Sequence, residues 1–258
     1  MRAIILAAGR GSRLSPSQPS PPLPKCLLKF DGVSLLERHL RLLQEAGVQE
    51  VVLALGFEHQ IVAAELARLA ALGLPEAEIV INERFTLGSV LTVQVAADAM
   101  RRGGDVLLMD ADVLYDARIM QALASGAAPA NRILIDRDFE AGDEPVKVCV
   151  QDGIPVELRK QVASGLQYDT IGESVGFFRF DQQAARRVAA LAADYVASGR
   201  ANLPHEEVLR DLILERSQVF QIVDVTGAPW IEIDFPADVE RAAREVLPQL
   251  LSLSGVAA

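Results

Sequence analysis

The sequence contains few cysteines and histidines, a single tryptophan and no long apolar run. Its two cysteines, Cys26 and Cys149, lie far apart and match no metal-binding or redox spacing, so a reducing environment is expected. No stretch approaches the roughly 18 to 20 apolar residues of a membrane span, and the apolar start at residues 3–8 is too short for a signal segment. We therefore expect a cytoplasmic protein without membrane insertion.

Acidic residues are missing from the first thirty positions, although the chain of 258 residues has a formal net charge of −10. The basic residues of this segment are Arg2, Arg10, Arg13, Lys25 and Lys29. A protein with a pI near 4.9 lacks the spread of positive charge that nucleic acid or an anionic membrane requires. Nucleic acid is therefore not an expected partner, and positive charge confined to one segment suggests a small anion.

Short apolar strands alternate with amphipathic helices in the first half of the sequence. Strands are predicted at residues 2–6, 50–55, 78–82 and 105–110, and helices at 34–47, 59–72 and 88–100. This alternation predicts βαβ units and a mainly parallel sheet with helices on both faces. The expected fold class is α/β, a Rossmann-like three-layer α/β/α sandwich.

The second half predicts a mixed sheet with a small antiparallel extension, because the Asp152-Gly153 pair indicates a hairpin turn. Strands are predicted at 132–136, 146–151 and 173–180, helices at 182–198 and 205–216, and a final strand pair at 218–225 and 229–235. A closing helix follows, with Pro236 near its first turn. No repeat or linker separates the halves, so we expect one domain at 1–247 and a C-terminal tail at 248–258.

Residues 6–25 read LAAGRGSRLSPSQPSPPLPK and directly follow the first predicted strand. Gly9 and Gly11 resemble part of a dinucleotide-binding motif, but the prolines that follow block the helix that this motif needs. The Walker pattern fails as well, because Lys25 lies too far along and no Ser or Thr follows it. The glycines let the backbone approach an anion, and Arg13 and Lys25 supply cations. We therefore predict a phosphate-binding loop of another kind.

AAGRGSRL followed by PLPK resembles the signature loop of the nucleotidyltransferases that make activated sugars and alcohols. These enzymes join a nucleoside triphosphate to a phosphate-bearing acceptor and release pyrophosphate. MDADV at 109–113, and IEID at 231–234 with PADVERA shortly after it, resemble the two metal-site regions of the family. IDRDF, VKVCVQDG, VGFFRF and PWIEIDFPADVERA add a likeness to the small cytidylyltransferases acting on phosphocholine, inositol 1-phosphate or aminoalkylphosphonates. The likeness extends from residue 1 to about 247.

The resemblance implies a nucleotidyl transfer that depends on Mg²⁺. Asp112 and Asp234 would hold the metal, in agreement with the preference of Mg²⁺ for carboxylate and substrate oxygens. Arg13 and Lys25 would be catalytic, because two charged phosphate groups must be screened as they meet. The nucleotide, CTP or another triphosphate, would contact Leu6, Ala8, Gly9, Arg10, Gly11, Ser12, Arg13, Gly88, Ser89 and Asp110. The phosphate- or phosphonate-bearing acceptor would contact Lys147, Glu173, Gly176, Trp230 and Glu232.

The chemistry of the acceptor bears on several other side chains. A phosphate monoester is already a nucleophile at neutral pH, so a general base is unnecessary. The histidines, which are then expected at helix surfaces or caps, are His39, His59 and His205. An acceptor with an amine or a trimethylammonium group would need carboxylates and aromatic faces. Further candidates for such contacts are Phe85, Tyr168, Asp169 and Phe177.

Other interpretations stay open on the sequence. One is a sugar-1-phosphate nucleotidyltransferase that uses UTP, GTP or dTTP, and another is a non-catalytic nucleotide-binding regulatory module. Leu87-Gly88-Ser89 stands where choline-type members often carry paired asparagines, which disfavours phosphocholine itself. A polyol acceptor and a homo-oligomer are also compatible with the sequence.

Overall fold

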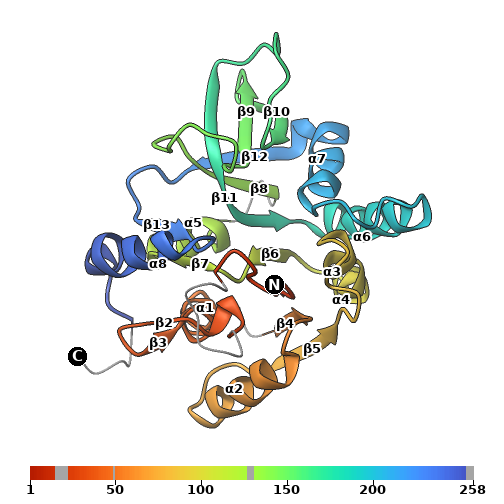
Figure 1. Ribbon diagram of the computed structural model, residues 1–258. Helices are drawn as coiled ribbons and strands as arrows, with labels where there is room; N and C mark the ends of the chain where they lie inside the picture. The colour runs from red at the N-terminus through yellow and green to blue at the C-terminus, as the bar shows by residue number, and fades with distance from the viewer. Residues whose placement is uncertain (15–22, 49, 127–130, 254–258) are drawn as a thin grey trace.

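The computed structural model describes residues 1–14, 23–48, 50–126 and 131–253. It contains a nine-stranded mixed sheet with helices packed around it (Figure 1). In sheet order, the main path consists of β10 (Ile154–Arg159), β9 (Lys147–Gln151), β11 (Thr170–Phe180), β6 (Val106–Asp110), β1 (Arg2–Ala7), β4 (Glu50–Leu55) and β5 (Ala77–Ile81). Of the two remaining strands, β8 (Asn131–Asp136) pairs with β11, and β12 (Phe220–Asp224) pairs with β8. Two short ribbons lie outside this sheet: β2 (Lys29–Phe30) with β3 (Val33–Ser34), and β7 (Val113–Tyr115) with β13 (Trp230–Glu232).

Helices cover both faces of the sheet. They are α1 (Leu35–Glu45), α2 (His59–Ala71), α3 (Val90–Val95), α4 (Ala97–Arg101), α5 (Ala117–Ala124), α6 (Gln182–Ala197), α7 (Glu206–Glu215) and α8 (Pro236–Arg241). Ile4 and Leu6 of β1 pack into a core shared with α3, α4, α6 and α7. Ala3, Ile5 and Ala7 pack into a second core, shared with α1, α2 and α5. Because successive strand side chains point to opposite faces, the result is three layers, and the predicted α/β/α fold class is confirmed.

The parallel half of the sheet determines where a ligand can bind. β4 and β6 flank β1 in parallel, and Leu6 pairs with Ala54 on one side and with Asp110 on the other. The carboxyl ends of β1 and β6 therefore lie side by side. The glycine-rich loop after β1 and the turn after β6 meet at this edge, which is where open α/β sheets place their ligands.

The antiparallel part of the sheet is built on β11. This strand runs antiparallel to β6, β8 and β9, so it joins the parallel half to the extension. The predicted hairpin is confirmed between β9 and β10, where Asp152 and Gly153 have φ angles of 52° and 78°. Figure 1 shows β9, β10 and the upper part of the long strand β11 at the top of the view, with α7 beside β10.

Two sequence expectations about elements need correction, and one helix was not predicted. The predicted final strand pair is wrong, because β12 runs parallel to β8 whereas β13 pairs with β7. Each strand finds a partner far away in the sequence, which no local pattern indicates. The helix predicted at 88–100 is interrupted at Ala96 and forms α3 and α4. Helix α5 was not predicted, although Asp116 caps it by accepting a hydrogen bond from the Arg118 backbone N–H.

The end of the chain continues the predicted closing helix. After α8, a π-helical turn spans Ala242–Val246 and a 3₁₀ turn spans Leu247–Gln249. The backbone N–H of Leu251 then donates to Asp116 at 2.8 Å, and Leu253 is buried. The proline-rich residues 15–22 and the last residues of the predicted tail, 254–258, lie outside the described residues. No helix in the described ranges is both long enough and apolar enough to span a bilayer.

Candidate active site

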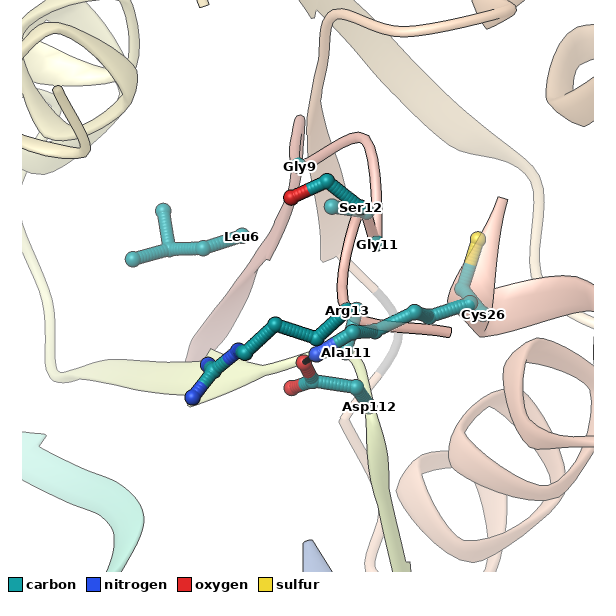
Figure 2. Close-up of a pocket in the computed structure, with 10 residues that line it drawn as sticks. Leu6, Gly9, Gly11, Ser12, Arg13, Cys26, Ala111 and Asp112 are labelled. Carbon is teal, nitrogen blue, oxygen red and sulfur yellow. Dashed lines mark hydrogen bonds and ion pairs between the residues drawn. The ribbon is translucent and has the colours of Figure 1, made fainter. Parts of the chain in front are cut away.

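The glycine-rich loop brings two cations to the carboxyl end of β1. Gly11 has a φ angle of +59°, and a Cβ at this position would lie 3.0 Å from Cγ of Lys25. Leu14 closes the described part of the loop: its N–H donates to the Gly11 carbonyl at 2.9 Å and its side chain is buried. The chain returns in a 3₁₀ turn, Lys25–Leu27, that carries Lys25 beneath the loop. In Figure 2, Gly9, Gly11 and Ser12 line one side of a cavity of about 230 Å³, and Asp112 lines another side.

Three carboxylates converge opposite these cations. Asp112 lies in the turn after β6, Glu232 ends β13, and Asp234 follows two residues later. One oxygen of each carboxylate lies within 4.8 Å of the others. The pairing of β13 with β7 holds them together, because Glu232 lies opposite Val113 and the Ile233 N–H donates to the Asp112 carbonyl at 2.9 Å. We call Asp112, Glu232 and Asp234 the acidic triad.

The acidic triad already binds a cationic group of the protein. The ammonium of Lys25 lies 2.7 Å from Oδ2 of Asp112 and 2.7 Å from Oδ1 of Asp234. Arg13 binds the same Asp234 oxygen at 2.8 Å. Burial opposes the charged form of Lys25, but the carboxylates of Asp112 and Asp234 outweigh it and raise the pKa of this group. Carboxylate oxygens that converge on one positive charge in this way suit a hard divalent cation such as Mg²⁺.

Asp110 and His205 form the wall next to the acidic triad. Burial, followed by the charges of Asp112 and Glu206, raises the pKa of Asp110 well above its ordinary value. Its Oδ1 lies 3.7 Å from Nε2 of His205. The backbone N–H of His205 in turn donates to Oγ of Ser89 at 2.7 Å, which joins the start of α7 to the start of α3.

Two larger cavities meet at the acidic triad. The first, of about 270 Å³, lies between the glycine-rich loop, Ser89 and His205, and we call it the nucleotide cavity. The second, of about 550 Å³, lies beyond Glu232 and Asp234 and includes Trp230 and residues 138–145; we call it the acceptor cavity. Both cavities are lined by Glu232 and Asp234, so groups bound in them would meet at these carboxylates.

Acidic side chains dominate the acceptor cavity. Glu173 on β11 lies opposite Asp136 on β8, and burial, followed by the charge of Asp136, raises the pKa of Glu173 to about 7. Trp230 donates from Nε1 to Oδ2 of Asp136 at 2.8 Å, so this indole is held in place. Arg241 is the only basic residue among the described residues that line this cavity.

Most of the residues predicted to bind nucleotide come together. Those that line the nucleotide cavity are Leu6, Ala8, Gly9, Arg13, Ser89 and Asp110. The predicted catalytic residue Lys25 and the predicted metal ligands Asp112 and Asp234 line the same cavity. Gly11 and Ser12 line the smaller cavity under the loop. Arg10 and Gly88 line none of these cavities: the Arg10 guanidinium lies 5.8 Å from the centre of the Phe57 ring, and Gly88 packs against the backbone of residues 201–202.

The predicted acceptor residues divide in the same way. Glu173, Trp230 and Glu232 line the acceptor cavity. Gly176 instead lies against Asp110, where a Cβ would be 2.6 Å from Oδ2. The ammonium of Lys147 donates to three backbone carbonyls, those of Lys160 at 2.6 Å, Gly142 at 2.7 Å and Pro145 at 3.3 Å. Contact of Lys147 with an acceptor therefore stays a prediction.

The further acceptor candidates lie away from the cavities described above. Phe177 is fully buried and packs edge-on against Tyr115 in the core. Phe85 packs near Phe57, with ring centres 6.3 Å apart. Asp169 accepts a hydrogen bond from the Asp152 N–H at the tip of the extension, and Tyr168 beside it is exposed.

The expectation that all histidines lie at surfaces or caps is wrong for His39, which is buried within α1, whereas His205, although also buried, does occupy the N-cap position of α7. His39 hydrogen-bonds through Nε2 with the Ala111 carbonyl and through Nδ1 with the Tyr115 hydroxyl, each at 3.2 Å. It therefore supports the turn that carries Asp112, and burial lowers its pKa to about 4. A sequence signal was present, because His39 falls on the apolar stripe of α1 between Leu36 and Leu43.

His59, in contrast, lies at the predicted kind of position, because it begins α2 and contacts the Gly56 carbonyl through Nδ1 at 3.3 Å. Sequence reasoning also missed Asp136, Glu144 and Lys160. These residues lie on or beside strands of the extension, and no spacing in the sequence relates them to the glycine-rich loop.

A three-layer α/β fold, with cations on a glycine-rich loop facing an acidic triad at the carboxyl edge of parallel strands, defines the nucleotidyltransferase class. Residues 3–173 match the family model of the MobA-like NTP transferase domain. The chain therefore belongs to the MobA-like NTP transferase family, and the resemblance expected from the sequence is confirmed.

Several characterised proteins resemble the chain at modest identity. CMP-5′-(3-aminopropyl)phosphonate synthase of Streptomyces rubellomurinus is 26% identical over 246 residues, which cover 94% of this chain and 38% of that protein. The bifunctional IPC transferase and DIPP synthase of Aquifex aeolicus is 26% identical over 246 residues, covering 94% and 51%. CTP:phosphoglutamine cytidylyltransferase of Campylobacter jejuni is 25% identical over 261 residues, covering 93% and 98%. The chain thus spans about half the length, or less, of the first two relatives and nearly the full length of the third.

Solved structures share the fold. The inositol-1-phosphate CTP transferase from T. maritima superimposes with a TM-score of 0.78 at 22% identity, covering 100% of this chain and 98% of that chain. The CTP:phosphocholine cytidylyltransferase from Streptococcus pneumoniae superimposes with a TM-score of 0.70 at 15% identity, covering 94% and 97%. At these identities the agreement concerns the architecture.

Proposed function

We propose that this chain transfers CMP from CTP to a small acceptor that carries a phosphate or phosphonate, and releases pyrophosphate in a Mg²⁺-dependent reaction. The observation that carries the proposal is the position of Lys25 and Arg13 on the acidic triad, at the junction of the nucleotide and acceptor cavities. This is where an acceptor oxygen and the α-phosphorus of a triphosphate would meet.

The residues of the chain supply positioning and charge. Two anions repel each other as they approach, so fixed positive groups at the point of contact lower the barrier. Lys25 and Arg13 provide such groups, and backbone amides of the glycine-rich loop add hydrogen-bond donors. Mg²⁺ held by the acidic triad would neutralise further charge on the triphosphate and its leaving group. The acceptor dianion is itself the nucleophile, so the buried His39 and His205 need not remove a proton.

The charge of the acceptor cavity favours an acceptor with a cationic tail. Glu173, Asp136, Glu232 and Asp238 lie around it, and the ring of Trp230 adds an aromatic surface. A cation buried among carboxylates beside an indole is attracted by both, whereas a neutral polyol gains nothing from the excess negative charge. The names of two relatives, a CMP-5′-(3-aminopropyl)phosphonate synthase and a CTP:phosphoglutamine cytidylyltransferase, support cytosine as the base, and the first name supports an amine on the acceptor.

The experiment is a measurement of pyrophosphate release with CTP, UTP, GTP and ATP. Each nucleotide is combined with 2-aminoethylphosphonate, phosphoethanolamine, phosphocholine, inositol 1-phosphate and glucose 1-phosphate, with Mg²⁺ or with excess EDTA. We expect release with CTP and an amine-bearing acceptor, and its loss in EDTA. Release only with UTP or GTP and a sugar phosphate would replace this proposal by a sugar-1-phosphate nucleotidyltransferase.

Asp112→Asn tests the acidic triad in the same assay. Asp112 is a proposed Mg²⁺ ligand and also pairs with Lys25, so loss of its charge should lower the rate of pyrophosphate release by at least about 100-fold. The control is Asp98→Asn, which removes the same charge from an exposed position on α4. Equal activity of the two variants would contradict the assignment of Asp112.

A further inference from the structure

The two cations Arg13 and Lys160 meet on a single carboxylate oxygen of the protein. Oε2 of Glu144 lies 3.1 Å from the Arg13 guanidinium and 3.0 Å from the Lys160 ammonium. Arg13 belongs to the glycine-rich loop, Lys160 follows β10, and Glu144 lies in the segment 138–145 that borders the acceptor cavity. Arg13, which is 131 residues from Glu144 in the sequence, and Lys160, which is 16 residues from it, therefore meet at one anionic group.

The partners of Glu144 are those that a phosphate would use. A guanidinium and an ammonium directed at one oxygen form charge-assisted hydrogen bonds, the strong type that phosphate groups accept in proteins. The second Arg13 nitrogen binds Asp234 at 2.8 Å, so an anion in the position of Glu144 lies next to the acidic triad. More than half of the Glu144 side chain is exposed, and exposed ion pairs exchange readily with other ions.

Lys147 holds this arrangement together. Its ammonium donates to the carbonyls of Gly142 and Pro145, which flank Glu144, and to the carbonyl of Lys160. The segment that carries the carboxylate and the residue that carries the cation are thereby fixed to the same side chain. Lys147 is a positioning residue in this arrangement.

We infer that Glu144 occupies the anion subsite of the acceptor, formed by Arg13 and Lys160, and that the acceptor's phosphate or phosphonate displaces it. That the displacing anion is the acceptor rests on the proposed function. That Arg13 and Lys160 form an anion-binding subsite rests on the contacts of Glu144. A carboxylate attached to the same chain competes at a high effective concentration. A dianion attracts the two cations about twice as strongly as a monoanion does, so it displaces Glu144 where a monoanion fails. Glu144 thus makes the subsite selective for doubly charged groups.

The experiment measures the binding of inorganic phosphate to the full chain without nucleotide, by isothermal titration calorimetry. Glu144→Gln keeps the shape of the side chain and removes its charge, so we expect the affinity for phosphate to rise at least fivefold. Asp143→Asn is the matched control: it removes a neighbouring carboxylate that forms no ion pair among the described residues, and we expect a change below twofold. Lys160→Met added to Glu144→Gln should abolish the gain.

The outcomes separate this inference from the proposed function, because phosphate binding needs neither CTP nor turnover. The inference is overturned if E144Q binds phosphate no more tightly than D143N does. It is also overturned if the gain in affinity survives the addition of K160M, or if E144Q shows no detectable binding of phosphate. Thermal unfolding of each variant shows whether it is folded, and E144A provides a second neutral variant. Once an acceptor is identified, its KM should fall in E144Q while the KM for CTP stays within twofold. Dimethyl phosphate, a phosphodiester with a single negative charge at neutral pH, should inhibit E144Q more strongly than it inhibits the wild type.

Discussion

At the scale of single residues, Gly176 shows how a missing side chain shapes the site. Its φ angle is +78°, and a Cβ would lie 2.6 Å from Oδ2 of Asp110. The glycine therefore permits both the bend in β11 and the position of the carboxylate that borders the nucleotide cavity. Sequence similarity suggested contact with the acceptor at this position, whereas the structure shows contact with Asp110.

Gly176→Ala should impair activity more than its backbone strain explains. An alanine in the left-handed region costs about 1–2 kcal/mol of stability, and here its methyl group also displaces Asp110. We expect pyrophosphate release to fall at least about tenfold. Gly153→Ala is the matched control, since Gly153 has the same φ angle of +78° with no atom within 4 Å of its Cβ position. Similar activity in the two variants would show that displacement of Asp110 is unimportant.

At the scale of elements, one aspartate, Asp181, both caps the N-terminus of α6 and joins this helix to β8. Asp181 accepts a hydrogen bond from the Ala184 N–H at 2.7 Å and caps the helix. Its other carboxylate oxygen accepts from the buried Asn131 side chain of β8 at 2.9 Å, and its own N–H donates back to Asn131 at 2.7 Å. Because α6 packs in the same core as α3 and α7, this junction supports the wall that carries Ser89 and His205.

Asp181→Ala should destabilise the protein by more than the loss of a helix cap alone would. Loss of a cap costs about 1 kcal/mol, and leaving a buried amide unpaired costs about 1–3 kcal/mol more. We expect a lower thermal midpoint, measured by calorimetry, than for Ser34→Ala, which removes the isolated cap of α1. Equal shifts for the two variants would mean that the link to Asn131 contributes nothing.

At the scale of the whole molecule, buried titratable groups make stability depend on pH in two opposite directions. The pKa of His39 falls from 6.5 to about 4 on folding, so its contribution is present above pH 6.5 and is lost as the pH falls towards 4. The pKa of Glu173 rises from 4.5 to about 7, so its contribution is present below pH 4.5 and is lost as the pH rises to about 7. The two effects overlap and partly cancel in weakly acidic solution.

Glu173→Gln should separate these effects. Its amide does not titrate, so the thermal midpoint of this variant should rise relative to the wild type between pH 4.5 and 7 and then run parallel to it. Calorimetry at constant ionic strength from pH 4 to 8.5 measures the difference. Asp143→Asn, which removes another exposed carboxylate from the same cavity, is the control. A difference between E173Q and the wild type that does not change with pH would rule out the shift of Glu173.

How far the sequence predicted the molecule depends on the range of each interaction. The Ser34 cap, the Asp152-Gly153 turn and the buried pattern of β1 are local, and their predicted structures are confirmed. The partners of β12 and β13 were missed, because register between distant strands is decided by packing across the whole sheet. The meeting of Glu144 with Lys160 and Arg13 was missed for the same reason.

The sequence alone determined the α/β class and the loop that carries Arg13 and Lys25, and through family resemblance it indicated Asp112 and Asp234. These features follow from short-range periodicity, from the conformational limits of glycine and proline, and from motifs that lie within a few residues. Only the tertiary structure decided that Glu232 lies beside Asp112 and Asp234, that His39 is buried beneath the turn that carries Asp112, and that Glu144 lies between two cations. These contacts form only in the folded protein, because only the assembled sheet brings the ends of strands that are distant in the sequence to one edge.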